Sequence, residues 1–61
     1  LNIFAATVEE ITPYGSSQIM VRLDANGAPI LARITRKSAE NLSLTVGQQV
    51  FAQIKTVALL S

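Results

Sequence analysis

The sequence predicts a small all-β domain, and three observations carry that prediction. Sixteen of the 61 residues are Val, Ile or Thr, which favour strands, whereas the eight alanines follow no helical spacing. Apolar and polar residues alternate along several segments, as they do in half-buried strands. An Asn-Gly pair, the best two-residue hairpin turn, separates two of these segments.

The first strand is expected over residues 4–11, where Phe4, Ala6 and Val8 share one face. The alternation breaks near Glu9 and Glu10, which predicts a bulge or a bend at that point. A cluster of turn-forming residues at positions 13–17 is expected to end the strand.

The next two strands form the clearest pattern in the chain. Ile19, Val21 and Leu23 alternate with polar or charged residues over positions 18–24. Asn26-Gly27 follows, and the alternation resumes at positions 30, 32 and 34. We therefore expect a β-hairpin closed by a type I′ turn.

The alternation stops after Thr35, and residues 36–44 predict a helix of two turns at most, capped by Thr35 or by Ser38. Val46-Gly47 predicts a turn, and a last strand is expected from Val50 towards Leu60. This order of elements suits a five-stranded barrel of the OB type, with one short helix before the last strand. The count of five requires that the first strand bends and serves as two strands of the barrel.

Composition limits the size and the setting of the domain. Residues 1–61 have room for one core, the chain is 49% apolar with a net charge of +1, and it has no cysteine or histidine to staple the fold. Self-association is the expected remedy for so small a core. From the start at Leu1 we expect a fragment of a larger protein. No apolar run or leader-like segment predicts a membrane span or a signal peptide, so a cytoplasmic location is expected.

Two function classes are disfavoured by the inventory of side chains. Without His or Cys the chain lacks the usual catalytic nucleophile and base and the usual zinc ligands, so it is not expected to be an enzyme or to bind a metal ion. Two Phe, one Tyr and no Trp, with little net charge, do not suit nucleic-acid binding. Phe4 and Phe51 are expected to lie in the core. The four carboxylates are expected to be surface charges at scattered positions: Glu9, Glu10, Asp24 and Glu40.

Basic residues and hydroxyls gather around the expected helix start. Arg33, Arg36 and Lys37 bracket Thr35 and Ser38, and a helix start with unpaired N–H groups can hold an anion. The simpler interpretation, which spacing alone favours, is that one hydroxyl caps the helix.

Lys55 lies in the expected last strand, next to Thr56. Its ammonium either reaches solvent along the aliphatic stem or has an anionic partner.

Three stretches of the chain resemble a known family. I-T-R-K-S-A-E-N-L-S-L, then V-G-Q-Q-V-F-A-Q-I-K-T-V, and upstream N-I-F-A-A-T-V are similar to the molybdate-binding domain of the molbindin (TOBE or MOP) type. That domain also occurs at the C-terminus of molybdate importer ATPases, the version that this chain resembles more, and in a molybdate-responsive repressor. The resemblance covers nearly the whole chain.

The resemblance implies an OB-like barrel that assembles with copies of itself and binds molybdate or tungstate where subunits or paired modules meet. It places the oxyanion ligands on Thr35, Ser38, Lys55 and Thr56, with no further cofactor. A tetrahedral dianion accepts hydrogen bonds and donates none, so hydroxyls, N–H groups and a cation suit it.

One departure separates this chain from the family pattern. The family often has arginine before the asparagine and a serine further upstream, but here Leu1 precedes Asn2. Two hypotheses follow. The domain is an oxyanion sensor or store, as in an importer ATPase, or it is a ligand-free OB-like module that mediates dimerisation of a transporter ATPase.

Overall fold

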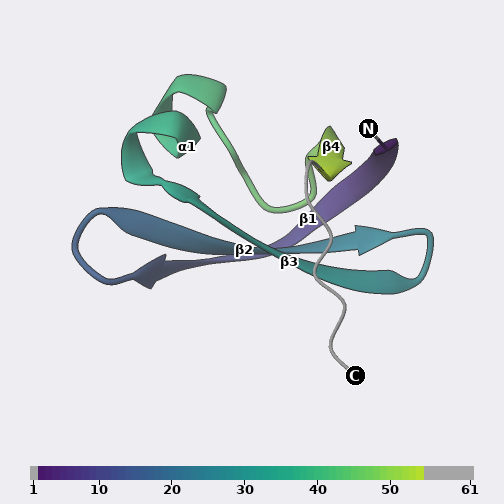
Figure 1. Ribbon diagram of the computed structural model, residues 1–61, viewed down its shortest axis with the longest axis horizontal. Helices are drawn as coiled ribbons and strands as arrows, with labels where there is room; N and C mark the ends of the chain where they lie inside the picture. The colour runs from purple at the N-terminus through teal and green to yellow at the C-terminus, as the bar shows by residue number, and fades with distance from the viewer. Residues whose placement is uncertain (1, 55–61) are drawn as a thin grey trace.

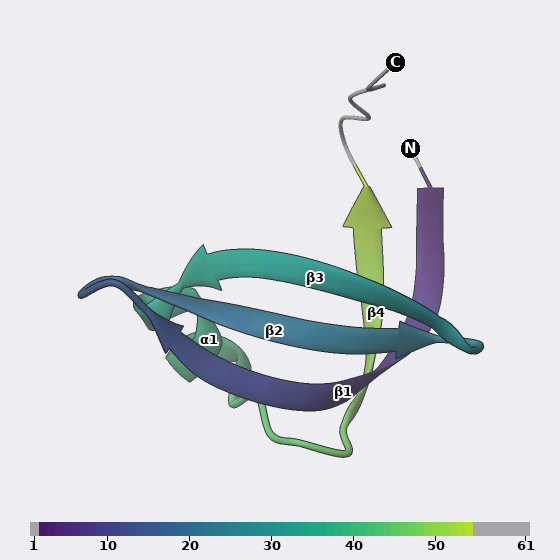
Figure 2. The same cartoon turned by 90° about the horizontal axis from the view of Figure 1, so that it is seen from below.

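The computed structural model describes residues 2–54 and shows a curled antiparallel sheet with one short helix (Figures 1 and 2). The strand order in the sheet is β3-β2-β1-β4. The elements are β1 Asn2–Tyr14, β2 Gln18–Ala25, β3 Ala28–Thr35, α1 Arg36–Leu42 and β4 Gln49–Ile54. The all-β class and the single helix before the last described strand are as predicted.

The described residues form four strands, so the expected count of five is wrong for this part of the chain. The expected count of five included the bent first strand twice. The structure confirms that β1 bends and pairs on both sides, but β1 remains one uninterrupted strand, so it counts once. Its residues 2–7 pair with β4, and its residues 7–14 pair with β2. Within residues 2–54 no ladder joins β3 to β4, so the sheet forms half a barrel.

The bulge predicted near Glu9 and Glu10 is confirmed. Val8 pairs with Leu23 and Glu10 pairs with Arg22, so Glu9 is the extra residue on β1. A bulge increases the local twist and bends the strand. This bend redirects β1 from its pairing with β4 to its pairing with β2, as Figure 2 shows.

The first strand runs further than predicted, because Pro13 and Tyr14 belong to it. Pro13 pairs with Ile19 of β2. Proline lacks an N–H donor and is tolerated in a strand where one edge needs no ladder bond. Among residues 2–54 the C-terminal half of β1 meets this condition, since β4 pairs with residues 2–7 and no other described strand lies on that edge.

The predicted β2–β3 hairpin is confirmed. Ala25 pairs with Ala28, and the two residues between them, Asn26 and Gly27, both have positive φ angles, 54° and 93°. Positive angles at both positions define the type I′ turn, which glycine and asparagine adopt at little cost.

The helix begins where predicted and ends earlier, at Leu42 instead of residue 44. Thr35 is the N-cap, which decides between the two predicted caps. At the other end Ser43 adopts a left-handed conformation with φ 51°. Its N–H donates to the Glu40 carbonyl at 3.1 Å, and the Leu44 N–H donates to the Ala39 carbonyl at 3.2 Å. This pair of bonds is a Schellman motif, which stops the helix.

The core lies between the curled sheet and α1. Its buried members come from alternating positions of β1 and β2: Ala6, Val8, Ile19, Val21 and Leu23. Phe4 packs against this cluster, as expected. Phe51 does not, because its side chain is 82% exposed, and its prediction as a core residue is wrong. Phe51 pairs with Ala5, one position out of step with the inward-facing Phe4 and Ala6.

The described residues include no helix long and apolar enough to span a membrane.

The left-handed Ser43 yields the first prediction. A Cβ atom in this conformation costs about 1–2 kcal/mol, whereas glycine loses about 0.5–1 kcal/mol of chain entropy on folding. We expect Ser43→Gly to raise the free energy of unfolding by about 0.5–1 kcal/mol, measured by urea denaturation. Ser43→Ala keeps the Cβ atom and is the control. A glycine variant no more stable than the alanine variant would contradict the prediction.

Candidate functional site

Thr35 and Ser38 lie together at the junction between β3 and α1. Thr35 ends the strand with an extended backbone, φ −71° and ψ 149°, and Ser38 lies in the first turn of the helix. Both side chains are exposed. The structure therefore brings together, at the surface, the two hydroxyls that the sequence singled out.

The two hydroxyls are joined by a directional hydrogen bond. Thr35 Oγ1 accepts the Ser38 backbone N–H at 3.1 Å, and the Thr35 hydroxyl donates to Ser38 Oγ at 2.8 Å. The hydrogen of Thr35 is thereby used within the pair. Ser38 receives it and keeps its own hydrogen for an external acceptor. Thr35 therefore positions and polarises the Ser38 hydroxyl, while Ser38 is the donor that a ligand would meet.

The backbone donors at the helix start are also partly used. The Arg36 N–H donates to the Ser17 carbonyl at 2.9 Å, which ties the β1–β2 turn to the helix. The Ser38 N–H is held by Thr35. Of the first three N–H groups of α1, that of Lys37 is left without a partner among the described residues. The sequence suggested a fuller set of free N–H groups than the structure provides.

The charges near this junction are arranged unequally. Arg33 reaches across the sheet to Tyr14, with its Nη1 3.2 Å from the phenol oxygen and its guanidinium carbon 5.1 Å from the ring centroid. This contact combines a hydrogen bond with a cation–π interaction. Arg36 and Lys37 are exposed on the helix. Lys55 and Thr56, the other two predicted ligands, lie outside the described residues.

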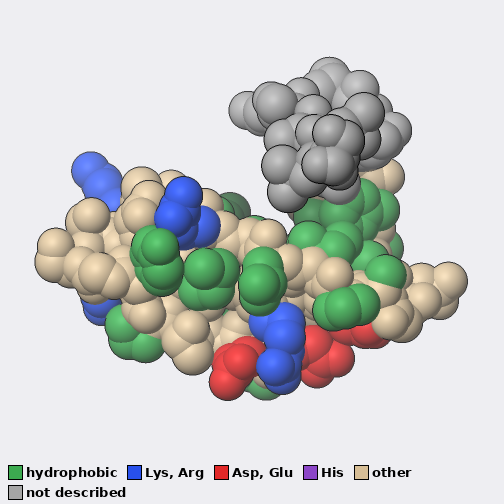
Figure 3. Space-filling model, turned by 60° about the horizontal axis from the view of Figure 1, so that its bottom comes forward, with side chains coloured by type: hydrophobic (Ala, Val, Ile, Leu, Met, Phe, Trp, Pro, Cys, Tyr) green, Lys and Arg blue, Asp and Glu red, His purple; other side chains and the backbone are tan. Residues whose placement is uncertain are grey.

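Three carboxylates lie on β1 and β2, namely Glu9, Glu10 and Asp24, whereas Glu40 lies on α1 itself. Glu10 and Arg22 are cross-strand partners and form an ion pair at 3.4 Å, with both side chains about half exposed. In Figure 3 the acidic side chains gather at one edge, around a basic side chain. Within residues 2–54 no three acidic side chains come close enough together to hold a metal ion.

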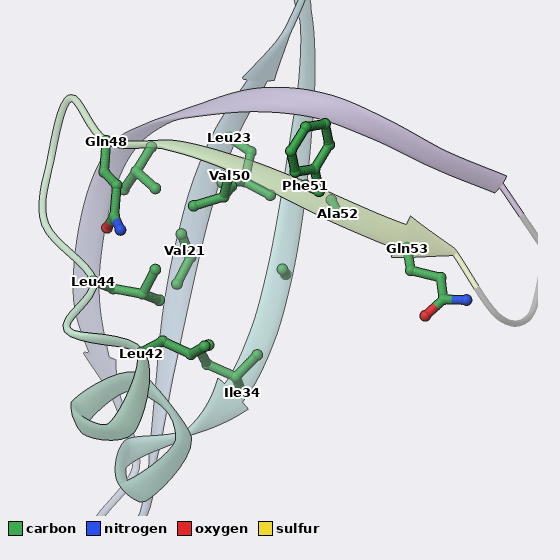
Figure 4. Close-up of a pocket in the computed structure, with 12 residues that line it drawn as sticks. Val21, Leu23, Ile34, Leu42, Leu44, Gln48, Val50, Phe51, Ala52 and Gln53 are labelled. Carbon is green, nitrogen blue, oxygen red and sulfur yellow. The ribbon is translucent and has the colours of Figure 1, made fainter.

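A cavity of about 420 Å³ opens on the concave side of the sheet (Figure 4). Its walls are mainly apolar and come from all four strands and the end of α1, including Val21, Ile34, Leu42 and Val50. Its polar side chains are the amides of Gln48 and Gln53. Transfer of an isolated dianion into such walls is costly, so this cavity is a poor oxyanion site. No local sequence pattern predicts this cavity, because it arises where the sheet stays open.

Comparison with known proteins decides the family. The TOBE domain family matches residues 1–60 of the chain. The chain belongs to the TOBE domain family. Its resemblance to molbindin-type domains, noted from the sequence, is thereby confirmed.

The curated relatives of this TOBE domain are much longer than the chain. The molybdenum import ATP-binding protein ModC of Bordetella parapertussis is 52% identical over 62 residues, which is all of this chain but 17% of the relative. ModC 1 of Azotobacter vinelandii is 45% identical over 60 residues, 97% of this chain and 17% of the relative. The chain thus spans about a sixth of these proteins.

A solved structure of similar size confirms the fold. A molybdate binding protein from Sporomusa ovata superimposes with a TM-score of 0.85 at 32% sequence identity, over 98% of the TOBE domain and 91% of that chain. The agreement over nearly the full length of both chains supports the half-barrel arrangement of the four strands.

The hydroxyl pair yields a prediction on stability. Thr35→Val keeps the branched shape but removes the cap, so we expect a loss of about 1 kcal/mol in the free energy of unfolding. Ser38→Ala keeps the capped N–H and should lose clearly less. Urea denaturation of the two variants measures the difference. Equal losses would show that Thr35 does not act as the cap.

Proposed function

We propose that this TOBE domain binds molybdate or tungstate, as the regulatory domain of a molybdate importer ATPase or as a molybdate store. Its relatives named as molybdenum import ATP-binding proteins and its structural neighbour named as a molybdate binding protein support this function. The observation that carries it is the Thr35–Ser38 pair, which presents one outward hydroxyl hydrogen at a helix start.

The chemistry of the pair suits a tetrahedral oxyanion. Molybdate offers four acceptor oxygens and has no hydrogen to donate at neutral pH, so each contact must come from a protein donor. The Ser38 hydroxyl and the Lys37 N–H are two such donors next to each other in sequence. We propose that Lys55 supplies the cation and Thr56 a further hydroxyl. Charge-assisted bonds of this kind are about twice as strong as neutral ones.

The exposure of the pair indicates that one copy provides an incomplete site. Thr35 and Ser38 both face solvent, where water competes for their hydrogen bonds and screens nearby charges. We propose that a second copy, or a second module, covers the anion at an interface. The oxyanion would then be bound where two surfaces meet.

The outward face of the arm formed by β4 and residues 2–7 of β1 is the surface that we propose for this assembly. The arm projects from the β2–β3 hairpin in Figure 2, and a two-stranded ribbon is marginally stable by itself in water. The side chains of Ile3 and Phe51 are 66% and 82% exposed on it. Burial of a phenylalanine side chain contributes about 1.5–3 kcal/mol, so a partner on this arm stabilises the domain.

The larger context is part of the same proposal. We place the domain as one non-catalytic module of a longer importer subunit, on the cytoplasmic side of the membrane. The domain is not proposed to insert into the membrane. It is also not proposed to bind nucleic acid, since the Tyr14 ring is engaged with Arg33 and Phe51 belongs to the arm.

A second function has a specific observation in its favour. The Thr35 hydroxyl is fully used by Ser38, since it accepts the Ser38 N–H and donates to Ser38 Oγ, and the Arg36 N–H is bound by Ser17. A cap that is complete within the chain needs no ligand. The alternative is therefore a ligand-free module that mediates dimerisation of a transporter ATPase.

Calorimetric titration with molybdate, then with sulfate, tests the oxyanion site. Lys55→Ala is expected to weaken molybdate binding roughly ten- to hundredfold, as for loss of a charged hydrogen-bond partner worth about 1.5–3 kcal/mol. Lys37→Ala removes the same charge near the site but keeps the backbone N–H, and is the control. Circular dichroism verifies that both variants fold. Equal affinities for wild type and Lys55→Ala would refute the site, and no heat from the folded wild type would favour the ligand-free alternative.

Light scattering tests the arm. Phe51→Glu places a charge where we propose an apolar contact, so the oligomer should dissociate to a monomer. Leu31→Glu is the matched control, because Leu31 is 67% exposed on β3, outside the arm. An oligomer that survives Phe51→Glu, or that Leu31→Glu disrupts equally, would place the interface elsewhere.

A further inference from the structure

The tip of the β2–β3 hairpin exposes an asparagine followed by a glycine. Asn26 and Gly27 are both exposed and form the two-residue turn between the paired residues Ala25 and Ala28. The side chain of Asn26 and the N–H of Gly27 make no hydrogen bond to any other described residue. A carboxamide and a backbone nitrogen next to each other are thus unprotected.

The space around Gly27 is open as well. A Cβ atom built on Gly27 would meet no atom within 4 Å, and glycine itself imposes few limits on φ and ψ. When the tip of the hairpin frays, the chain at this position can therefore change its conformation freely. The Gly27 nitrogen can then approach the side-chain carbonyl carbon of Asn26. Loop tips with small residues open at low free-energy cost.

We propose that Asn26 is a site of spontaneous chemical modification, by deamidation through a cyclic imide. The Gly27 nitrogen, after loss of its proton to base, attacks Cγ of Asn26. A nitrogen–carbon bond forms, the bond from Cγ to Nδ2 breaks, and ammonia leaves with the proton returned. Water then opens the five-membered ring at either carbonyl. Opening at the main-chain carbonyl gives isoaspartate, and opening at Cγ gives aspartate.

The two products should affect the fold differently. Asp-Gly suits a type I′ turn as Asn-Gly does, so aspartate preserves the hairpin. Isoaspartate carries the chain through the side-chain carbon and adds one backbone atom to a two-residue turn. The pairing of Ala25 with Ala28 is then lost, and strain reaches the pair formed by Leu23 and Ile30. Leu23 belongs to the buried core, so isoaspartate should loosen the domain.

Asn41 is the internal comparison. It lies within α1 and is followed by Leu42, whose side chain hinders attack and whose backbone is held in the helix. The full 61-residue chain is incubated folded at mildly alkaline pH and then analysed by peptide mass mapping. We expect conversion of the amide to the acid at Asn26 before any at Asn41, and faster conversion as pH rises. Conversion at Asn26 that is no faster than at Asn41 would overturn the proposal.

The Asn26→Asp variant separates the effect of the added charge on stability from the effect of the longer backbone. This variant has the added negative charge but a normal backbone, so its melting temperature should match that of the fresh protein. The isoaspartate fraction, purified by chromatography, should have a melting temperature at least about 4–8 °C below that of the fresh protein. If the isoaspartate fraction melts with the Asn26→Asp variant, the structural consequence proposed here is wrong.

Discussion

The fold depends on the way Val8 is held at the bend of β1. Val8 is fully buried, its N–H donates to the Gln48 carbonyl at 2.9 Å, and its carbonyl accepts the Gly47 N–H at 2.7 Å. These two bonds fasten the turn before β4 to the point where β1 changes partner. A buried backbone group without a partner is costly, so the turn and the bend stabilise each other.

The turn that makes these bonds has its own internal support. The Gln48 N–H donates to the Thr45 carbonyl at 3.2 Å, and Gly47 takes the positive φ of 91° that the third position of a type II turn requires. The Gln48 side chain accepts the Thr45 N–H at 3.0 Å. Position and direction of β4 follow from this turn. The arm and the open cavity are both consequences, because β4 pairs with β1 and, within residues 2–54, the edge of β3 that faces away from β2 has no strand partner.

The candidate site shows how a structural cap and a binding group can be the same residues. Thr35 is occupied as the cap, and its hydroxyl hydrogen is donated to Ser38, which leaves the Ser38 hydrogen for another acceptor. The proposed anion would therefore bind at the end of a hydrogen-bond chain that already exists in the folded domain. Such preorganisation reduces the free-energy cost of ordering the donors on binding. The apolar cavity has no comparable set of donors and is better suited to a structural role.

The sequence by itself determined the features that depend on near neighbours. The period-two pattern of Ile19, Val21 and Leu23 predicted the central strand, Asn26-Gly27 predicted the turn, and a hydroxyl at position 35 or 38 predicted the cap. Each of these follows from interactions over a few residues, which local composition encodes.

Only the tertiary structure decided the features that depend on distant partners. The strands number four and not five because β1 stays uninterrupted through its bend, Pro13 fits because no described strand pairs with that edge, and Phe51 is exposed because of its register against Ala5. The direction of the Thr35–Ser38 bond and the use of the Arg36 N–H by Ser17 were equally out of reach of the sequence. The physical reason is that register and hydrogen-bond partners between strands are set by long-range packing, which a local pattern does not contain.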